Sequence, residues 1–124
     1  MTKAKQPPTA DALLALRDAL RRFAQERDWD QFHLPKNLAI ALSVEAAELL
    51  EHFQWLDDQA SAQLTPEQLS EVSEEMADVL LYLIRLADKL GVDLQSAAQR
   101  KLEINARKYP AEQVRGSSKK YTRL

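Results

Sequence analysis

Residues 65–91 have the sequence TPEQLSEVSEEMADVLLYLIRLADKLG, which predicts one long helix with a defined start and end. Thr65 suits the N-cap, Pro66 the first helical position and Gln68 the third, so the segment begins with a capping-box pattern. Gly91 suits the left-handed position that follows a helix. We therefore predict a helix that starts after Thr65 and ends at about Leu90.

Two helices are predicted before this one. The first extends from about residue 9 to 28, with Thr9 as its N-cap and apolar side chains recurring along one side. Residues 29–34 (WDQFHL) interrupt the periodicity. The second extends from Pro35 to about Trp55, because proline suits the first turn of a helix.

A fourth helix is predicted from about Asp93 to Lys108, because Asp93 can cap it and Pro110 cannot donate an interior helical hydrogen bond. The polar stretch DDQASAQL (57–64) is predicted to be a turn. The last residues, AEQVRGSSKKYTRL, show no periodicity and are predicted to be a mobile or partner-ordered tail.

These segments predict a four-helix bundle in a single domain. The chain has 124 residues, of which 45% are apolar and 29% charged, as in an ordinary globular protein. We expect a flexible tail over residues 1–8, a helical domain over 9–110 and a basic tail over 111–124. Because the helices are rich in Ala and Leu on more than one side, we also expect a homo-oligomer.

The composition excludes several classes of function. The chain has no cysteine, so disulfides, zinc fingers and thiol nucleophiles are excluded. The net charge of −2 argues against binding to a nucleic-acid polymer. No apolar run is long enough to span a membrane, and the start, MTKAKQPPTA, lacks the apolar core of a signal peptide. A cytoplasmic location is the simplest expectation.

Acidic residues lie where two of the predicted helices should turn inward. Helical spacing places Glu45 within the stripe of leucines on the second helix and Glu48 at its edge. In the third helix, Glu75 and Asp78 border the apolar face one turn apart. Four facing carboxylates repel one another, and a hard divalent cation would relieve that conflict.

The ligand set favours Mg²⁺ or Mn²⁺, because it offers oxygen atoms without cysteine or a suitably placed histidine. Magnesium in proteins is often shared between carboxylates and substrate phosphates, which points to a nucleoside polyphosphate. The alternative for any single acidic pair is a solvated helix face. Two pairs at core-bordering positions of consecutive helices are harder to explain by solvation, and on spacing alone the metal site and the solvated faces both stay open.

Other residues suit the recognition of such a substrate. Lys101, Asn105 and Lys108 share one face of the fourth helix, where they could neutralise phosphate or simply be solvated. Aromatic rings would pack in the core by default, but the two tryptophans, which lie near segment ends, could instead stack a base. The aromatic candidates are Trp29, Phe32, Trp55 and Tyr82. For His33 and His52, a base contact, a phosphate contact and an ordinary surface position all stay open.

The motif EAAE (45–48) followed by EEMAD (74–78) resembles the metal motif of the all-α nucleoside triphosphate pyrophosphohydrolases of the MazG-like superfamily. The flanking blocks are similar to the dCTP pyrophosphatase group. They are ERDWDQFHLPKNLAIALSVEAAEL, FQW, ADVLLYLIRLA, KLEINARKYP and RGSSKKYT. Val44 and Ala47 replace the two glycines of the family's GEVGEL motif, and Leu20 stands where some relatives carry a substrate-contacting histidine.

The resemblance implies a Mg²⁺-dependent hydrolase of homotetrameric type. It would convert a nucleoside triphosphate, dCTP or a base-modified dCTP, to the monophosphate and pyrophosphate. The implied metal ligands are Glu45, Glu48, Glu75 and Asp78. Apart from the resemblance, we predict that one of the glutamates could accept the proton of the attacking water, Glu45 or Glu48 rather than Glu75. The implied base-enclosing residues are Trp29, Phe32, His33 and Trp55, with Tyr82 and Asn105 lining the same pocket. Lys101 and Lys108 would lie near the triphosphate.

Two other kinds of protein compete with this interpretation. A di-iron carboxylate bundle needs Glu-x-x-His pairs, and neither histidine follows a glutamate at that spacing. A non-catalytic helical oligomerisation module would account for the helices and their apolar surface but not for the four acids.

Overall fold

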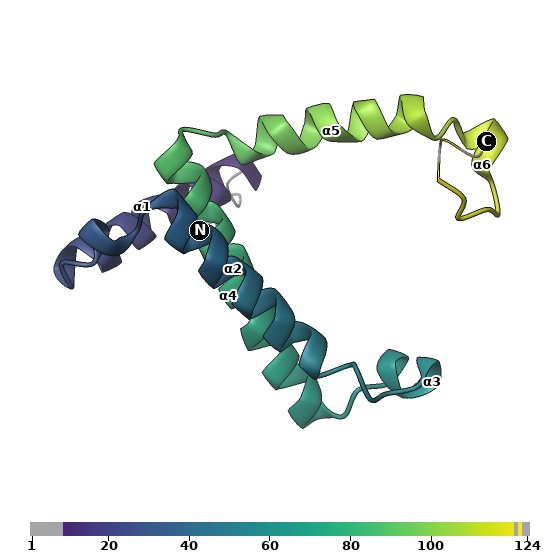
Figure 1. Ribbon diagram of the computed structural model, residues 1–124, viewed down its shortest axis with the longest axis horizontal. Helices are drawn as coiled ribbons and strands as arrows, with labels where there is room; N and C mark the ends of the chain where they lie inside the picture. The colour runs from purple at the N-terminus through teal and green to yellow at the C-terminus, as the bar shows by residue number, and fades with distance from the viewer. Residues whose placement is uncertain (1–8, 121, 123–124) are drawn as a thin grey trace, which may run out of the picture. The chain divides into compact units, whose positions relative to one another are not determined.

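The computed structural model describes residues 9–120 and 122 and is helical throughout its regular elements (Figure 1). No strand occurs in this described part, so the predicted all-α class is confirmed. The elements in chain order are α1 (Thr9–Glu26), the 3₁₀ turn η1 (Asp30–Phe32), α2 (Pro35–Glu51), α3 (Asp58–Ala62), α4 (Pro66–Leu90), α5 (Leu94–Lys108) and α6 (Ala111–Val114).

The chain divides into two compact units, residues 1–92 and 93–124. The first unit contains α1, η1, α2, α3 and α4, and the second contains α5 and α6. Three of the four long helices predicted from the sequence therefore lie in the first unit. The expected tail over residues 1–8 lies outside the described residues, and the domain boundary at 110/111 stays a prediction.

The ends of α4 are those that its sequence predicts. The Thr65 hydroxyl accepts from the Gln68 backbone N–H at 3.1 Å, and the Gln68 side chain accepts from the Thr65 N–H at 2.9 Å. Gly91 follows the helix with a φ of 68°, in the left-handed region that glycine adopts without a steric penalty. Local side-chain chemistry thus defines the 25-residue helix on which the site is built.

Helices α2 and α4 run side by side in opposite directions (Figure 1). His52, which follows α2, lies 3.7 Å from Glu71 in the first half of α4, whereas His33, just before α2, contacts Arg85 in the second half. Leu38 from α2 is buried together with Val72 and Ile84 from α4. The antiparallel pairing brings the acidic segments of the two helices level with each other.

Helix α1 packs against α4 and ends two residues before the predicted end. Asp28 adopts a left-handed backbone with a φ of 53°, which aspartate tolerates better than most residues. The Trp29 N–H then bonds the Ala24 carbonyl oxygen at 2.9 Å and turns the chain into η1. Ala24 and Ala87 are both buried, and their small side chains suit a close helix contact.

Three local predictions need correction. Residues 57–64 are not only a turn, because the Asp57 carboxylate accepts from the Ala60 N–H at 2.8 Å and starts α3. Helix α2 ends at Glu51 and not near Trp55, and hydrogen-bonded turns follow it. Residues 111–114 form α6 within the segment predicted to be a mobile tail, with the Val114 N–H bonded to the Pro110 carbonyl oxygen.

Many apolar side chains of the described chain remain exposed. Only Ala24, Leu38, Val72, Ile84 and Ala87 form its buried apolar core. On α2 and α4, exposed apolar residues include Ile40, Val44, Leu50, Leu69 and Met76. None of the helices in the described residues combines the length and apolar character that crossing a membrane requires.

Candidate functional site

Three carboxylates converge between α2 and α4. One carboxylate oxygen from each of Glu45, Glu48 and Glu75 lies within 4.8 Å of the others, and all three residues are half-buried. Glu45 and Glu48 lie one turn apart on α2, and the antiparallel pairing places Glu75 of α4 against them. Asp78, the fourth acid of the predicted set, lies beyond this group and is more exposed.

Two oxygens of this cluster are buried without a donor. The Oε2 atoms of Glu45 and Glu75 have no hydrogen-bond partner among the described residues. Buried carboxylate oxygens are normally satisfied by donors or by cations, and a divalent ion with a preference for oxygen ligands would satisfy both. The donor set therefore fits Mg²⁺ or a similar hard cation.

The crowding also changes the acidity of Glu45. Burial of the charged form, reinforced by the neighbouring Glu48 and Glu75 carboxylates and by the charge of Asp78, raises the pKa of Glu45 to about 7. When protonated, Glu45 can donate to Glu48 or Glu75, whereas three ionised carboxylates have no hydrogen to share. A proton and a divalent cation are thus alternative ways to relieve the same repulsion.

An apolar cavity of about 460 Å³ adjoins the carboxylate cluster. Its walls come from α1, from α4 and from the two residues that flank η1. The lining residues are Leu16, Ala19, Leu20, Phe23, Trp29, His33, Asp78, Leu81, Tyr82 and Arg85. Asp78 both lines the cavity and raises the pKa of Glu45, so the two features meet at this residue. The volume lies within the range of small-molecule sites.

Several residues proposed from the sequence to surround a base meet in this cavity. Trp29, His33 and Tyr82 line it, and so does Leu20. The Trp29 ring packs edge-on against Phe23 with the ring centroids 5.7 Å apart, which orients the indole. The arrangement offers flat apolar walls with a few polar groups, the composition expected for a base-binding pocket.

The remaining predicted residues belong to other segments of the chain. Phe32 is 61% exposed and Trp55 87% exposed, and neither lines the cavity. Lys101, Asn105 and Lys108 lie on α5 in the second unit, with Lys101 exposed and the other two half-buried. Their roles at the triphosphate or base stay predictions.

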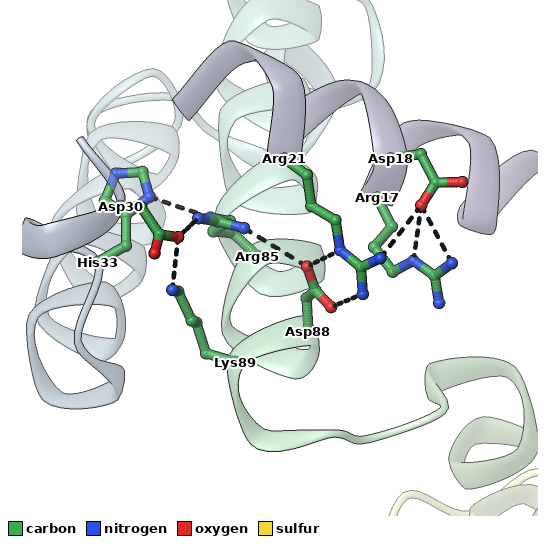
Figure 2. A network of polar contacts seen from close by, with 8 residues as sticks. All are labelled: Arg17, Asp18, Arg21, Asp30, His33, Arg85, Asp88 and Lys89. Carbon is green, nitrogen blue, oxygen red and sulfur yellow. Dashed lines mark hydrogen bonds and ion pairs between the residues drawn. The ribbon is translucent and has the colours of Figure 1, made fainter. Parts of the chain in front are cut away.

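A network of charged residues, shown in Figure 2, meets the cavity at Arg85 and His33. Arg85 is 4% exposed and uses all three guanidinium nitrogens: Nε donates to His33 Nδ1 at 3.0 Å, Nη2 to Asp30 at 2.5 Å and Nη1 to Asp88 at 3.4 Å. Arg21 of α1 binds Asp88 through two bonds, and Lys89 binds Asp30. The network therefore joins α1, η1 and α4.

The network shifts the acidities of its members. Hydrogen bonds from Lys89 and Arg85 lower the pKa of Asp30, and the bond from Arg21 lowers the pKa of Asp88. Burial lowers the pKa of His33, and the nearby charges of Arg85 and Lys89 act in the same direction. His33 is thus held neutral beside two cations.

Sequence reasoning missed Arg85 and the contacts that it makes with Asp30, His33 and Asp88. Asp78, Tyr82 and Arg85 follow one another at helical spacing and all line the cavity. The periodicity that selected Asp78 and Tyr82 therefore extends to Arg85. Its partners Asp30 and His33 lie more than 50 residues away in the chain, and only the packing of η1 on α4 reveals them.

Comparison with known proteins places these features in a family. A sequence model of the MazG-like family matches residues 40–124. Human dCTP pyrophosphatase 1 is 48% identical over 104 residues, which cover 82% of this chain, and the bovine protein of the same name is 45% identical over the same length. The chain spans 61% of the human protein and 62% of the bovine one.

A solved structure has the same fold. A pyrophosphatase from Archaeoglobus fulgidus superposes with a TM-score of 0.75 at 41% sequence identity. The match covers 88% of this chain and 99% of the archaeal one. The similarity therefore extends over nearly the full length of a protein of comparable size.

Proposed function

The chain belongs to the MazG-like family, and on this premise we propose that it is a Mg²⁺-dependent nucleoside triphosphate pyrophosphohydrolase. Its substrate would be dCTP or a base-modified dCTP, and its products the monophosphate and pyrophosphate. One observation carries the proposal: the carboxylate cluster, which has unsatisfied buried oxygens, meets the aromatic cavity at Asp78. One molecule with a base and a polyphosphate would occupy both.

The cluster would hold the metal. MazG-like enzymes generally depend on divalent metal ions, and the acids of α2 and α4 supply the oxygen ligands that Mg²⁺ prefers. Glu45, Glu48 and Glu75 would bind it, with Asp78 as the fourth acid. The bound ion would neutralise phosphate oxygens and make water a better nucleophile at neutral pH.

The protein's own groups would orient the substrate. Trp29 and Tyr82 would hold the base between apolar walls, which fixes the position of the triphosphate relative to the acids. Glu45 or Glu48 would accept the proton of the attacking water. No side-chain nucleophile is required.

A homo-oligomer, tetrameric as in the family, would complete the site. The exposed apolar residues of α2 and α4 support this proposal, because burying them in an interface would remove them from water. Trp55 lies away from the cavity of its own chain, so it would reach a base only in a second copy.

Product analysis of the purified protein with Mg²⁺ and a panel of triphosphates tests the proposal. We expect pyrophosphate from dCTP, and a loss of at least about 100-fold in rate for Glu48→Gln and Asp78→Asn. Glu51→Gln is the matched control, because Glu51 lies one turn from Glu48 on α2 but is exposed and outside the cluster. Orthophosphate as the product would indicate another reaction class, and activity that survives in both variants would exclude the metal assignment.

A further inference from the structure

The contact between Arg85 and His33 constrains the chemistry of the cavity. An arginine Nε–H can only donate, so His33 Nδ1 must be the acceptor in their 3.0 Å bond. A histidine that accepts at Nδ1 and is neutral carries its single ring proton on Nε2. The partner of His33 therefore determines its tautomer.

The surroundings hold His33 in this state. The charged groups that face it are Arg85 and Lys89 of α4 and Asp30 of η1. Asp30 is already bonded to both cations, and His33 itself is half-buried. Protonation of Nδ1 would break the bond to Arg85 and place a third positive charge beside two others.

We propose that Arg85 is a positioning residue that fixes His33 as the Nε2–H tautomer, so that the cavity presents a hydrogen-bond donor to its ligand. His33 lines the cavity, and its Nε2 atom has no partner among the described residues. The ligand group opposite it must be an acceptor, such as a ring nitrogen or a carbonyl oxygen of a base. The identity of the ligand as a nucleotide rests on the proposed function, but the tautomer does not.

Arginine is specifically suited to this role. Its planar guanidinium reaches His33, Asp30 and Asp88 together, whereas a lysine ammonium at the same position cannot match three partners in one plane. Arg85→Lys keeps the positive charge between the two aspartates but loses the Nε–H. Because a lysine ammonium can also donate, this variant separates the fixed geometry of the guanidinium from its positive charge.

Nuclear magnetic resonance of ¹⁵N-labelled protein without nucleotide tests the tautomer directly. The chain has only two histidines, and His52, at the opposite end of α2, serves as an internal reference. We expect His33 of the wild type to show an unprotonated Nδ1 and a protonated Nε2, and to stay neutral as the pH falls past about 6.5, the ordinary histidine pKa. In Arg85→Lys, the two tautomers should exchange and the ring should take up a proton at higher pH, with unchanged His52 signals.

A double-mutant cycle tests the effect on the ligand. Arg85→Lys should raise KM for dCTP about tenfold with little change in kcat. His33→Ala should raise KM further, and adding Arg85→Lys to His33→Ala should then have no additional effect. The exposed Arg22→Met variant is the control for the loss of an arginine.

The outcomes separate this inference from the proposed function. A wild-type spectrum with the proton on Nδ1, His33 spectra identical in wild type and Arg85→Lys, or KM effects that multiply in the double variant would each overturn the role of Arg85. A protein with the expected spectrum that hydrolyses no triphosphate would instead refute the proposed function and leave the tautomer assignment intact.

Discussion

Glu45 of α2 and Glu75 of α4 face each other with one buried carboxylate oxygen apiece that has no hydrogen-bond partner among the described residues. Glu48 completes the group on the α2 side. Without a cation, this arrangement costs stability, because like charges are held together at reduced solvation. The first two predictions follow from that cost.

Magnesium should stabilise the protein through these acids. We expect the thermal midpoint of the wild type to rise with Mg²⁺, by the equivalent of about 2.7 kcal/mol at a concentration 100 times the Kd. Glu75→Gln should lose this response and be at least as stable as the wild type in EDTA, because one repelling charge is gone. A thermal-shift titration measures both effects.

The matched control is Glu74→Gln, since Glu74 is the exposed neighbour of Glu75 on the same helix and lies outside the cluster. It should keep the full response to Mg²⁺. An equal loss in both variants would show that the stabilisation is a nonspecific effect of negative charge.

The metal-free protein should lose stability from the Glu45 site as the pH rises. The pKa of Glu45 is 4.5 when unfolded and about 7 when folded, so the folded state binds the proton more tightly. The contribution of Glu45 to the free energy of unfolding is fully present below pH 4.5 and is lost as the pH rises through about 7. Urea unfolding in EDTA across this range measures it.

Comparison of the wild type with Glu45→Gln isolates the part of the pH dependence of stability that comes from Glu45. His33 contributes in the opposite direction, because its lowered pKa makes stability increase with pH up to the unfolded value of 6.5. The difference between wild type and variant removes the His33 contribution. A difference that does not vary with pH would contradict the assignment.

The network around Arg85 should account for part of the acid sensitivity. The pKa of Asp88 is lower in the folded state than its ordinary value of 3.8. Its contribution to the free energy of unfolding is therefore present above pH 3.8 and is lost as the pH falls through the folded pKa. Asp88→Asn should destabilise the protein by roughly 1–3 kcal/mol at neutral pH and have less effect in acid. Asp58→Asn, at an exposed carboxylate without an ion pair in the described chain, should change the unfolding midpoint little.

Trp29 should contribute to nucleotide binding within one chain. Loss of a stacked base costs about 1–3 kcal/mol, so Trp29→Ala should raise KM for dCTP roughly 10- to 100-fold. Steady-state kinetics measure the change, and Trp29→Phe should lose less because it keeps a ring on the cavity wall. A change in kcat alone would argue against a stacking role.

Trp55 should act only between copies of the chain. If a second copy supplies it, Trp55→Ala should also raise KM, and a mixture of Trp55→Ala with the inactive Glu48→Gln should show sites with a lower KM than Trp55→Ala alone. Recovery requires sites that combine Glu48 of one chain with Trp55 of another. No recovery after subunit exchange would place the two residues in the same chain's site or remove Trp55 from it.

The sequence by itself determined the long helices and the inward acids. Thr65, Gln68 and Gly91 act through bonds to neighbours within a few residues, so the ends of α4 are visible in the sequence. The 3.6-residue period likewise places Glu45 with Glu48 and selects Glu75 on the facing helix. The short helices α3 and α6 were not predicted, because each is only about one turn long and lies in a polar segment without helical periodicity.

Only the tertiary structure decided how these helices are combined into a site. It placed Glu45, Glu48 and Glu75 together and left Asp78 on the wall of the cavity. It also brought Arg85 to His33, 52 residues apart in the chain. Periodicity states which face of a helix a residue occupies, but the partner of a buried charge is set by the packing of distant segments.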